Sequence, residues 1–231
     1  MKSSTLATPW SDHSAMLSPM PLHLEMGITR LPDGCLMVCV HNELRGCKGK
    51  MLDWWFTFFE TTEHIKWWHP YDHIEHKGWD EQWVRGVNYI GATIRAVESL
   101  GDIPPVEATL KFHDPRDVFA DPALREAFRR EHVSAIICAR IGFGADVELD
   151  PNGDPTDGEM IHLVRDTDTG CVLRSRFILG RSCRDPRAEV PDELGLGLLQ
   201  HCYSEFSYLA AFLPALFLAE TRKGASPSLR W

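Results

Sequence analysis

The sequence predicts an α+β fold in which one long C-terminal helix packs on an antiparallel sheet. Two pairs of strand-like segments, 24–30 with 35–41 and 159–165 with 171–179, are each joined by a short stretch rich in turn residues. An uninterrupted helical pattern then runs from about residue 192 to residue 223. Strands that come first and a long helix that comes last are typical of a sheet covered on one face by helix.

The other elements follow from residue type and spacing. Residues 1–22 are rich in Ser, Pro and Met without periodicity, so we expect a loose or partner-contacting extension. Residues 51–68 show a helical pattern that stops before Pro70. The segments between these and the second hairpin are expected to form strands at 86–98, 106–113 and 133–143, a short helix at 121–131 and an acidic loop at 150–158.

Composition limits the classes of function. A chain of 231 residues with 44% hydrophobic and 25% charged residues can bury a sizeable core in one domain. Its net charge of -9 argues against a surface for nucleic acid or anionic lipid, because both need clustered Lys and Arg. We therefore expect a small-molecule partner, with no nucleic acid and no membrane.

The cysteines and the apolar runs bear on location. Seven scattered cysteines without a C-x-x-C pair suit reduced thiols. The segment after Met1 has no apolar run long enough for a secretory signal. The longest apolar run, Leu209–Ala219, is too short to span a bilayer. The expected location is cytoplasmic.

His201 and Glu205 lie one turn apart on the expected C-terminal helix. Both fall on a stripe of otherwise apolar residues at three- and four-residue spacing between residues 194 and 212. A carboxylate there is costly unless it is paired or bound to a metal, and an i, i+4 pair can grip one ion. A His–Glu hydrogen bond in the core is the alternative.

A second group of polar residues lies between Glu63 and His76. It holds four histidines within thirteen residues, next to two tryptophans. These imidazoles could line an apolar pocket, with Asp72 orienting a neighbouring ring, or they could be incidental residues of a surface turn.

Four motifs in this order resemble one family. They are the run His64–His73, the stretch Gly91–Gly101, the segment His162–Gly180 and the His201-x-x-x-Glu205 pair. Together they resemble the 2,4-diacetylphloroglucinol hydrolase family, which includes phloretin hydrolases, over about residues 50–220. The resemblance implies a Bet v1-like helix-grip domain at 46–231, with the sheet wrapped around the C-terminal helix. It also implies an N-terminal extension at 1–45 that is used in forming a homodimer.

The same resemblance implies a zinc ion held by two histidines and two glutamates. Position by position, these ligands match His73, Glu98, His201 and Glu205. Two rivals remain open, since Glu107 lies on the polar face of the 106–113 strand and His69 precedes His73 by four residues. Two imidazoles and two carboxylates suit Zn²⁺, with Mn²⁺ or Fe²⁺ as alternatives.

The resemblance also implies the pocket residues. His162 matches a pocket histidine that could carry a proton, with His76 as a second catalytic candidate. Where the family holds phenolic hydroxyl groups with tyrosines and an asparagine, the matching residues are Ile65, Phe177 and His76, and His69 is a further expected substrate contact. Phe177 and His162 should share one face of their hairpin.

These expectations lead to a metal-dependent hydrolase that cleaves a C–C bond in an acylated polyphenol or polyketide-like ketone. The first alternative is a non-hydrolytic cyclase, isomerase or decarboxylase of secondary metabolism, which the apolar residues at 65 and 177 favour. The second is a non-enzymatic protein that binds an apolar ligand.

Overall fold

The computed structural model describes residues 9–181 and 189–222. The helices are η1 (Ser14–Leu17), α1 (Gly49–Phe58), α2 (Thr62–Trp68), α3 (Pro115–Val118), α4 (Asp121–Arg129) and α5 (Asp192–Thr221). The strands are β1 (Gly27–Arg30), β2 (Leu36–Arg45), β3 (His73–Trp79), β4 (Thr93–Leu100), β5 (Ile103–His113), β6 (Ala135–Phe143), β7 (Gly158–Thr167) and β8 (Gly170–Leu179).

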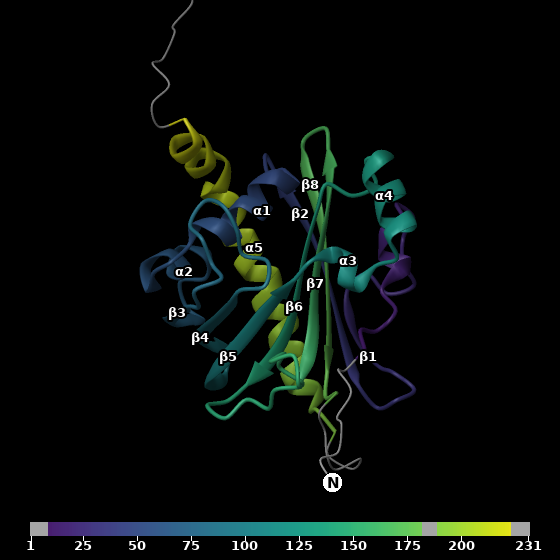
Figure 1. Ribbon diagram of the computed structural model, residues 1–231, viewed down its shortest axis with the longest axis vertical. Helices are drawn as coiled ribbons and strands as arrows, with labels where there is room; N and C mark the ends of the chain where they lie inside the picture. Colours follow the sequence, from purple (N-terminus) through teal and green to yellow (C-terminus); the bar gives the residue numbers. More distant parts are fainter. Residues whose placement is uncertain (1–8, 182–188, 223–231) are drawn as a thin grey trace, which may run out of the picture.

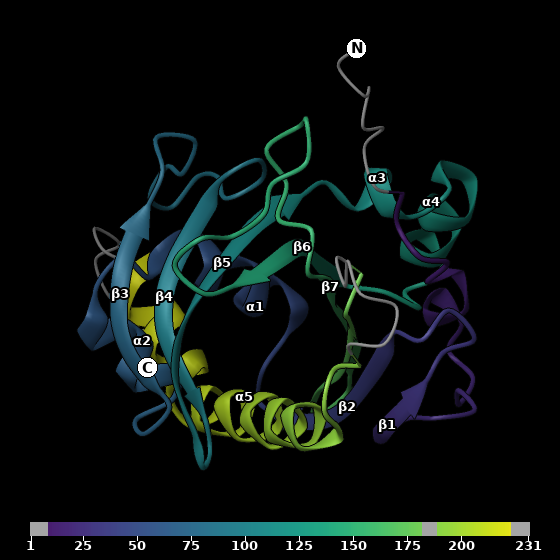
Figure 2. The same cartoon turned by 90° about the horizontal axis from the view of Figure 1, so that it is seen from below.

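All eight strands form one antiparallel sheet around α5. The order is β1-β2-β8-β7-β6-β5-β4-β3. Figure 1 shows α5 running diagonally across the sheet, and Figure 2 shows the strands curving so that α5 lies along the open side. The α+β, Bet v1-like helix-grip fold expected from the sequence is confirmed.

One side of the helix α5 faces the interior of the molecule. Leu198, Cys202, Phe206, Leu209 and Leu213 are buried there, and the helix continues past Pro214. Among the described residues, α5 is the one helix whose length and composition would suffice to cross a membrane. Core helices share this property, and α5 packs against β2, β1 and β4.

The helical pattern expected at 51–68 forms two helices, α1 and α2, with a break at residues 59–61, and it ends before Pro70 as expected. The helix α1 ends at Phe58, where the indole N–H groups of Trp83 and Trp79 donate to the carbonyl oxygens of Phe56 and Phe59. These bonds satisfy carbonyl groups that a helix end leaves free. Thr61 then starts α2 by accepting a hydrogen bond from the amide of His64.

The strand expected at 86–98 begins only at Thr93. Gly86 and Gly91 have positive φ angles of 70° and 82°, so the backbone turns there instead of extending. The strand β3, at 73–79, was not expected, because this segment was interpreted as a helix end or turn. The strand β3 lies beside β4 at the edge of the sheet.

The N-terminal segment from residue 9 to residue 26 packs on the outer face of the sheet (Figure 2). Arg174, which faces outward from β8, donates to the carbonyl oxygens of Ser18 and Met20 and pairs with Glu25 at 2.8 Å. The expectation of a loose segment is therefore wrong for residues 9–22. Residues 1–8 lie outside the described residues.

The expected boundary between residues 45 and 46 falls at the end of β2, a strand of the sheet. The strand β2 pairs with β8 over its whole length, from Leu36↔Leu179 to Arg45↔Gly170. The sheet thus begins before residue 46, and the part of residues 9–45 that precedes the sheet ends before β1. Dimer formation by this extension stays a prediction.

The outer face of the sheet carries a buried charge network. Glu159 on β7 is fully buried and pairs with Arg140 at 3.0 Å, Arg181 at 3.0 Å and His13 at 2.8 Å. Its carboxylate also accepts from the amide of Ser11. The network ties the N-terminal segment to the strands, since His13 and Ser11 belong to that segment.

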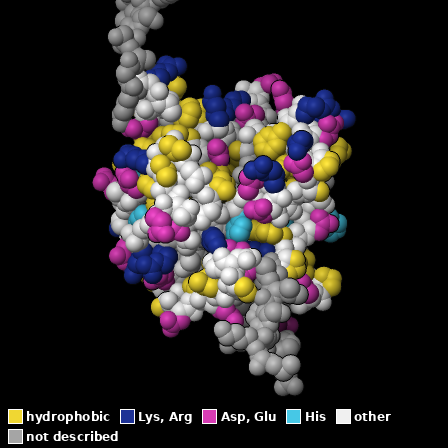
Figure 3. Space-filling model, viewed as in Figure 1, with side chains coloured by type: hydrophobic (Ala, Val, Ile, Leu, Met, Phe, Trp, Pro, Cys, Tyr) yellow, Lys and Arg dark blue, Asp and Glu magenta, His cyan; other side chains and the backbone are white. Residues whose placement is uncertain are grey.

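The exposed surface is mixed in charge on the face shown in Figure 3, where Lys and Arg side chains lie next to Asp and Glu side chains. The absence of a nucleic-acid partner stays a prediction. In the part of the chain that the structure describes, six cysteines are buried thiols, at 35, 39, 47, 138, 171 and 202. Cys183 lies outside the described residues.

Candidate active site

A cavity lies between α5, the inner face of the sheet and the helices α1 and α2. Together with the open solvent at its mouth, the space not filled by atoms amounts to about 750 Å³. Its walls are Phe56, Phe59, Ile65, Trp68, His73, Ile94, Ala96, Glu98, Ala108, Leu110, Phe112, Ile141, Phe143, Met160, His162, Phe177, Leu198, His201 and Glu205.

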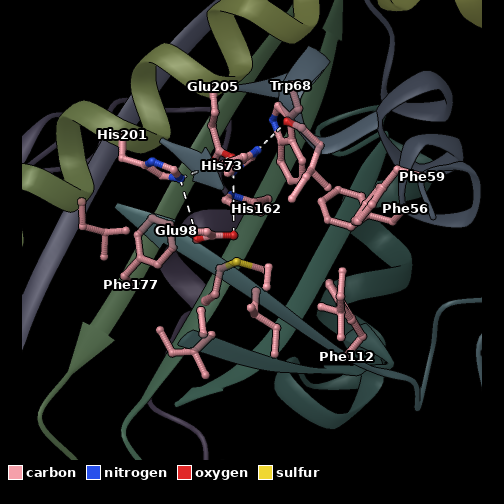
Figure 4. A pocket seen from close by; sticks show the side chains of 18 of the residues that line it. Phe56, Phe59, Trp68, His73, Glu98, Phe112, His162, Phe177, His201 and Glu205 are labelled. Atoms are coloured by element: carbon pink, nitrogen blue, oxygen red, sulfur yellow. Dashed lines mark hydrogen bonds and ion pairs between the residues drawn. The ribbon is translucent and has the colours of Figure 1, made fainter. Parts of the chain in front are cut away.

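Four of these side chains, which we call the polar cluster, come together at one end of the cavity (Figure 4). They are His73, Glu98, His201 and Glu205. The Nε2 atom of His73 lies 3.6 Å from an oxygen of Glu205 and 3.8 Å from an oxygen of Glu98. The Nε2 atom of His201 lies 3.8 Å and 4.0 Å from oxygens of the same two residues.

Three elements bring the polar cluster together. His73 opens β3 and stands directly opposite Glu98 of β4 in the sheet register. His201 and Glu205 lie one turn apart on the buried side of α5. Tertiary packing of the helix against the strands thus joins segments that are far apart in the sequence.

Hydrogen bonds fix the orientation of both imidazole rings. The Nδ1 atom of His73 lies 2.7 Å from the carbonyl oxygen of Ile65, which can only accept, so Nδ1 carries the proton. The Nδ1 atom of His201 lies 3.1 Å from a carboxylate oxygen of Asp72. Both rings therefore direct Nε2 toward the two glutamates, as metal-binding histidines with an outer partner do.

Burial shifts the pKa values of the cluster in both directions. Burial and the neighbouring His201 lower the pKa of His73 to about 3, so its ring is neutral. Burial raises the pKa of Glu205 to about 8 and also raises the pKa of Glu98. For His201, burial is outweighed by the bond to Asp72 and the charges of Glu205 and Glu98, and its pKa is raised to about 9.

The neutral His73 makes the cluster suited to a cation. Its proton is on Nδ1, so a lone pair on Nε2 faces carboxylate oxygens, and this contact is favourable only with a proton or a cation between them. Donor atoms held 2.0–2.2 Å from a tetrahedral zinc ion lie about 3.3–3.6 Å from one another. The observed 3.6–4.0 Å spacings are close to this, and the two imidazoles and two carboxylates fit a divalent metal.

The rival glutamate is on the opposite face of the sheet. In the register of β4 and β5, Glu107 stands opposite Val97, whereas Glu98 stands opposite Val106. Since neighbouring residues of a strand point to opposite faces, Glu107 points away from the cavity. Its oxygens instead lie 3.6 Å from Lys77 and 3.6 Å from Arg95.

The rival histidine, His69, lies behind the cluster. Its ring stacks on His201 with centroids 5.0 Å apart, and its Nδ1 atom accepts a hydrogen bond from the amide of Asp72. The proton of a neutral His69 is then on Nε2, which lies 2.8 Å from the hydroxyl oxygen of Ser204. His69 is not among the residues that line the cavity, so the structure does not bring it to the expected substrate position.

The expected pocket residues divide into two groups. His162, Phe177 and Ile65 line the cavity, and the rings of His162 and Phe177 lie 5.7 Å apart on the same face of the hairpin, as expected. His76 does not line it, because its ring packs between Phe59 and Trp79. The bulge between His76 and Gly78 in β3 accompanies this placement.

Sequence reasoning missed two partners of the candidate residues. The Ile65 carbonyl group orients His73, and the Ser175 hydroxyl group lies 2.7 Å from Nδ1 of His162. A backbone carbonyl leaves no signal in residue type. Ser175 could have been found from strand alternation, which turns Ser175 and Phe177 inward between the outward Arg174 and Arg176.

Fold and site together define a helix-grip protein with a buried cluster of imidazoles and carboxylates at one end of an apolar cavity. Within this class, the chain belongs to the DAPG hydrolase PhiG domain family, whose family model matches residues 6–218.

Two named relatives are hydrolases. The phloretin hydrolase of Eubacterium ramulus is 25% identical over 215 residues, covering 86% of this chain and 73% of the relative. The 2,4-diacetylphloroglucinol hydrolase of Pseudomonas protegens is 27% identical over 238 residues, covering 92% and 74%.

Two solved structures are also similar to this chain. Ara h 8.0201 has a TM-score of 0.45 and 11% identity, covering 78% of this chain and 99% of that one. The major latex-like protein 151 of Panax ginseng has a TM-score of 0.45 and 10% identity, covering 76% and 95%.

Proposed function

We propose that this protein is a metal-dependent hydrolase that cleaves a C–C bond in an acylated polyphenol or polyketide-like ketone. The observation that carries the proposal is the polar cluster, in which two oriented imidazoles direct Nε2 toward two carboxylates inside an apolar cavity. Zinc is the proposed ion, with manganese or iron as alternatives. A cytoplasmic location and a homodimer formed through the N-terminal segment belong to the same proposal.

The relatives support the class of substrate. Phloretin hydrolase and 2,4-diacetylphloroglucinol hydrolase act, by their names, on aryl ketones, and they match most of this chain. The reaction adds water across the bond between the carbonyl carbon and the adjacent carbon. The hydroxyl group goes to the carbonyl carbon to give a carboxylic acid, and the other carbon takes the bonding electron pair and a proton.

The polar cluster and the walls divide the chemical work. A divalent cation, when bound, supplies a Lewis acid that polarises a substrate oxygen. Asp72 and the Ile65 carbonyl group hold His201 and His73 in the orientation that such a site requires. The apolar walls exclude bulk water, which strengthens every electrostatic interaction at the polar end.

His162 is the proposed proton-transfer residue. Burial lowers its pKa to about 3, so the ring is neutral at physiological pH. Such a ring cannot store a positive charge, but it can accept a proton at one nitrogen while releasing one at the other. Its contact with Ser175 fixes the ring in the cavity wall.

The second candidate function is a metal-dependent reaction in which water is not a reactant, as in a cyclase, isomerase or decarboxylase. The observation that favours it is that Ile65 and Phe177 line the cavity without a hydroxyl group to hold a phenol. This reading predicts turnover without an acid product.

The experiment starts with the metal content of purified protein. Elemental analysis should find about one equivalent of Zn, Mn or Fe, and the Glu98→Gln and Glu205→Gln proteins should lose most of it. Glu107→Gln is the matched control and should keep the metal, because Glu107 faces Lys77 and Arg95. Metal-free wild-type protein that is folded and cannot be loaded would refute the metal site.

The product test follows with loaded protein. Incubation with mono- and diacetylphloroglucinol, followed by mass spectrometry, should show acetic acid and the deacetylated phenol. Turnover without any acid would favour the second candidate. Binding without turnover by a folded protein that takes up no metal would indicate a non-enzymatic carrier.

A further inference from the structure

Polarity is strongly segregated inside the cavity. The polar cluster and His162 lie toward one end, and Trp68, whose indole nitrogen has no hydrogen-bond partner, lies beside the cluster (Figure 4). Its ring centroid is 5.2 Å from that of His73. The other lining residues are aliphatic, aromatic or, at Met160, a thioether.

The apolar end has nothing to offer a hydroxyl group. Among the described residues that line the cavity, none is a Ser, Thr, Tyr, Asn or Gln. The backbone of β4 is also occupied, since it pairs with β5 from Thr93↔Lys111 to Glu98↔Val106. A substrate hydroxyl group buried there would lose its hydrogen bonds to water without replacement.

Two alanines make room next to the polar cluster. Ala96 and Ala108 stand directly opposite each other on β4 and β5, and both line the cavity. Ala96 is two residues from Glu98 on the same face of the strand. Their methyl groups thus form the wall that a substrate body meets once its oxygens are at the cluster.

We propose that the preferred substrate is a ketone with one polar head, a 1,3-dicarbonyl group or its enol, and an apolar body without further hydroxyl groups. Ala96 and Ala108 set the size of that body. The choice of this polar head depends on the proposed hydrolytic function. The two oxygens of a 1,3-dicarbonyl group can bind one cation together, and its central carbon can leave as a stabilised enolate. The body rests on the cavity walls alone.

The matched probes are 1-phenylbutane-1,3-dione and its 3,5-dihydroxyphenyl analogue, which differ only in two ring hydroxyl groups. Water adds its hydroxyl group to one carbonyl carbon, and the central CH₂ carbon takes the electron pair of the broken bond and the remaining proton. The products are a carboxylic acid and a methyl ketone, and no oxidant or reductant is needed. The value of kcat/KM should be about ten- to hundredfold higher for the phenyl compound.

A variant tests the role of the alanines. Ala108→Leu should lower kcat/KM for 1-phenylbutane-1,3-dione relative to pentane-2,4-dione, which has the same head and no large body, by about tenfold. Ala211→Leu, on the exposed side of α5, is the matched control and should leave this ratio as it is in the wild type. An unchanged ratio in Ala108→Leu would overturn the role given to Ala108.

A binding measurement separates this inference from the proposed function. Because Trp68 lines the cavity, ligand binding can be followed by quenching of tryptophan fluorescence. Acetophenone should bind more tightly than 3,5-dihydroxyacetophenone, whether or not the protein hydrolyses any dione. Equal or tighter binding and turnover of the dihydroxy compounds would overturn the inference. So would hydrolysis of acetylphloroglucinols with no hydrolysis of either dione.

If no probe is hydrolysed but the binding preference holds, the proposed function fails and the apolar ligand class stands.

Discussion

Asp72→Asn tests whether His201 is held as a metal ligand by the carboxylate behind it. An oxygen of Asp72 lies 3.1 Å from Nδ1 of His201 and 3.4 Å from Nε2 of His69. Asparagine keeps the size of the side chain and one accepting oxygen, so the ring can keep its orientation. What is lost is the negative charge, which makes the imidazole a better electron donor.

The expected size follows from the position of Asp72. The Asp72 carboxylate contacts His201, which belongs to the polar cluster. Its other described contacts with side chains are to His69 and Ser99, and none is to His73, Glu98 or Glu205. Removing such an outer partner weakens metal binding about 10- to 100-fold, or about 1.4–2.7 kcal/mol. Because the Asp72 side chain is only 12% exposed, water replaces little of the lost charge interaction.

The assay is a competition titration of Zn²⁺ against a coloured chelator, with circular dichroism to confirm folding. Asp146→Asn, at an exposed position, is the control and should bind as the wild type does. An unchanged affinity in Asp72→Asn would refute the reasoning. A loss as large as that of Glu205→Gln would also refute it, because Asp72 would then be a ligand itself.

Three further predictions concern stability. Glu159→Gln should lower the free energy of unfolding at pH 7, measured by urea titration, by about 3 kcal/mol. The reason is that Arg140 and Arg181 lose the negative charge of a fully buried partner. A change below about 1 kcal/mol would contradict a stabilising network. Burial raises the pKa of Glu159, but the bond from His13 and the charges of Arg181 and Arg140 outweigh it, so the folded pKa is lowered. The stabilisation by the Glu159 carboxylate is then complete above its pKa in the unfolded chain, about 4.3, and is lost as the pH falls through its lower pKa in the folded protein. The difference in unfolding free energy between wild type and Glu159→Gln should therefore shrink on acidification. A constant difference between about pH 7 and about pH 3 would contradict this sign. Leu209→Ala, at a fully buried position of α5, should cost about 2–5 kcal/mol, whereas Leu218→Ala, 43% exposed, should cost less than about 0.5 kcal/mol.

The helical half of the candidate site could be predicted from the sequence. Residues four positions apart lie on the same side of a helix, so the sequence predicts that the side chains of His201 and Glu205 are neighbours. The hairpin of β7 and β8 likewise placed His162 and Phe177 on one face. Both results depend only on local periodicity.

The strand half could not be predicted in the same way. Glu98 and Glu107 lie on neighbouring strands, and which of them faces the cavity depends on a register that shifts by one residue at a bulge. The roles of His69 and His73 depend on which ring nitrogen is already bonded, to the amide of Asp72 or to the carbonyl group of Ile65. These are contacts between backbone and side chain that residue type does not encode.

The sequence by itself determined the α+β class, the long C-terminal helix and the pairing of His201 with Glu205, because periodicity and turn residues act over short distances. Only the tertiary structure decided that His73 and Glu98 join this pair, that His76 stays outside the cavity, and that residues 9–26 cover the outer face of the sheet. The physical reason is that strand register, bulges and ring orientation are set by packing between segments far apart in the chain.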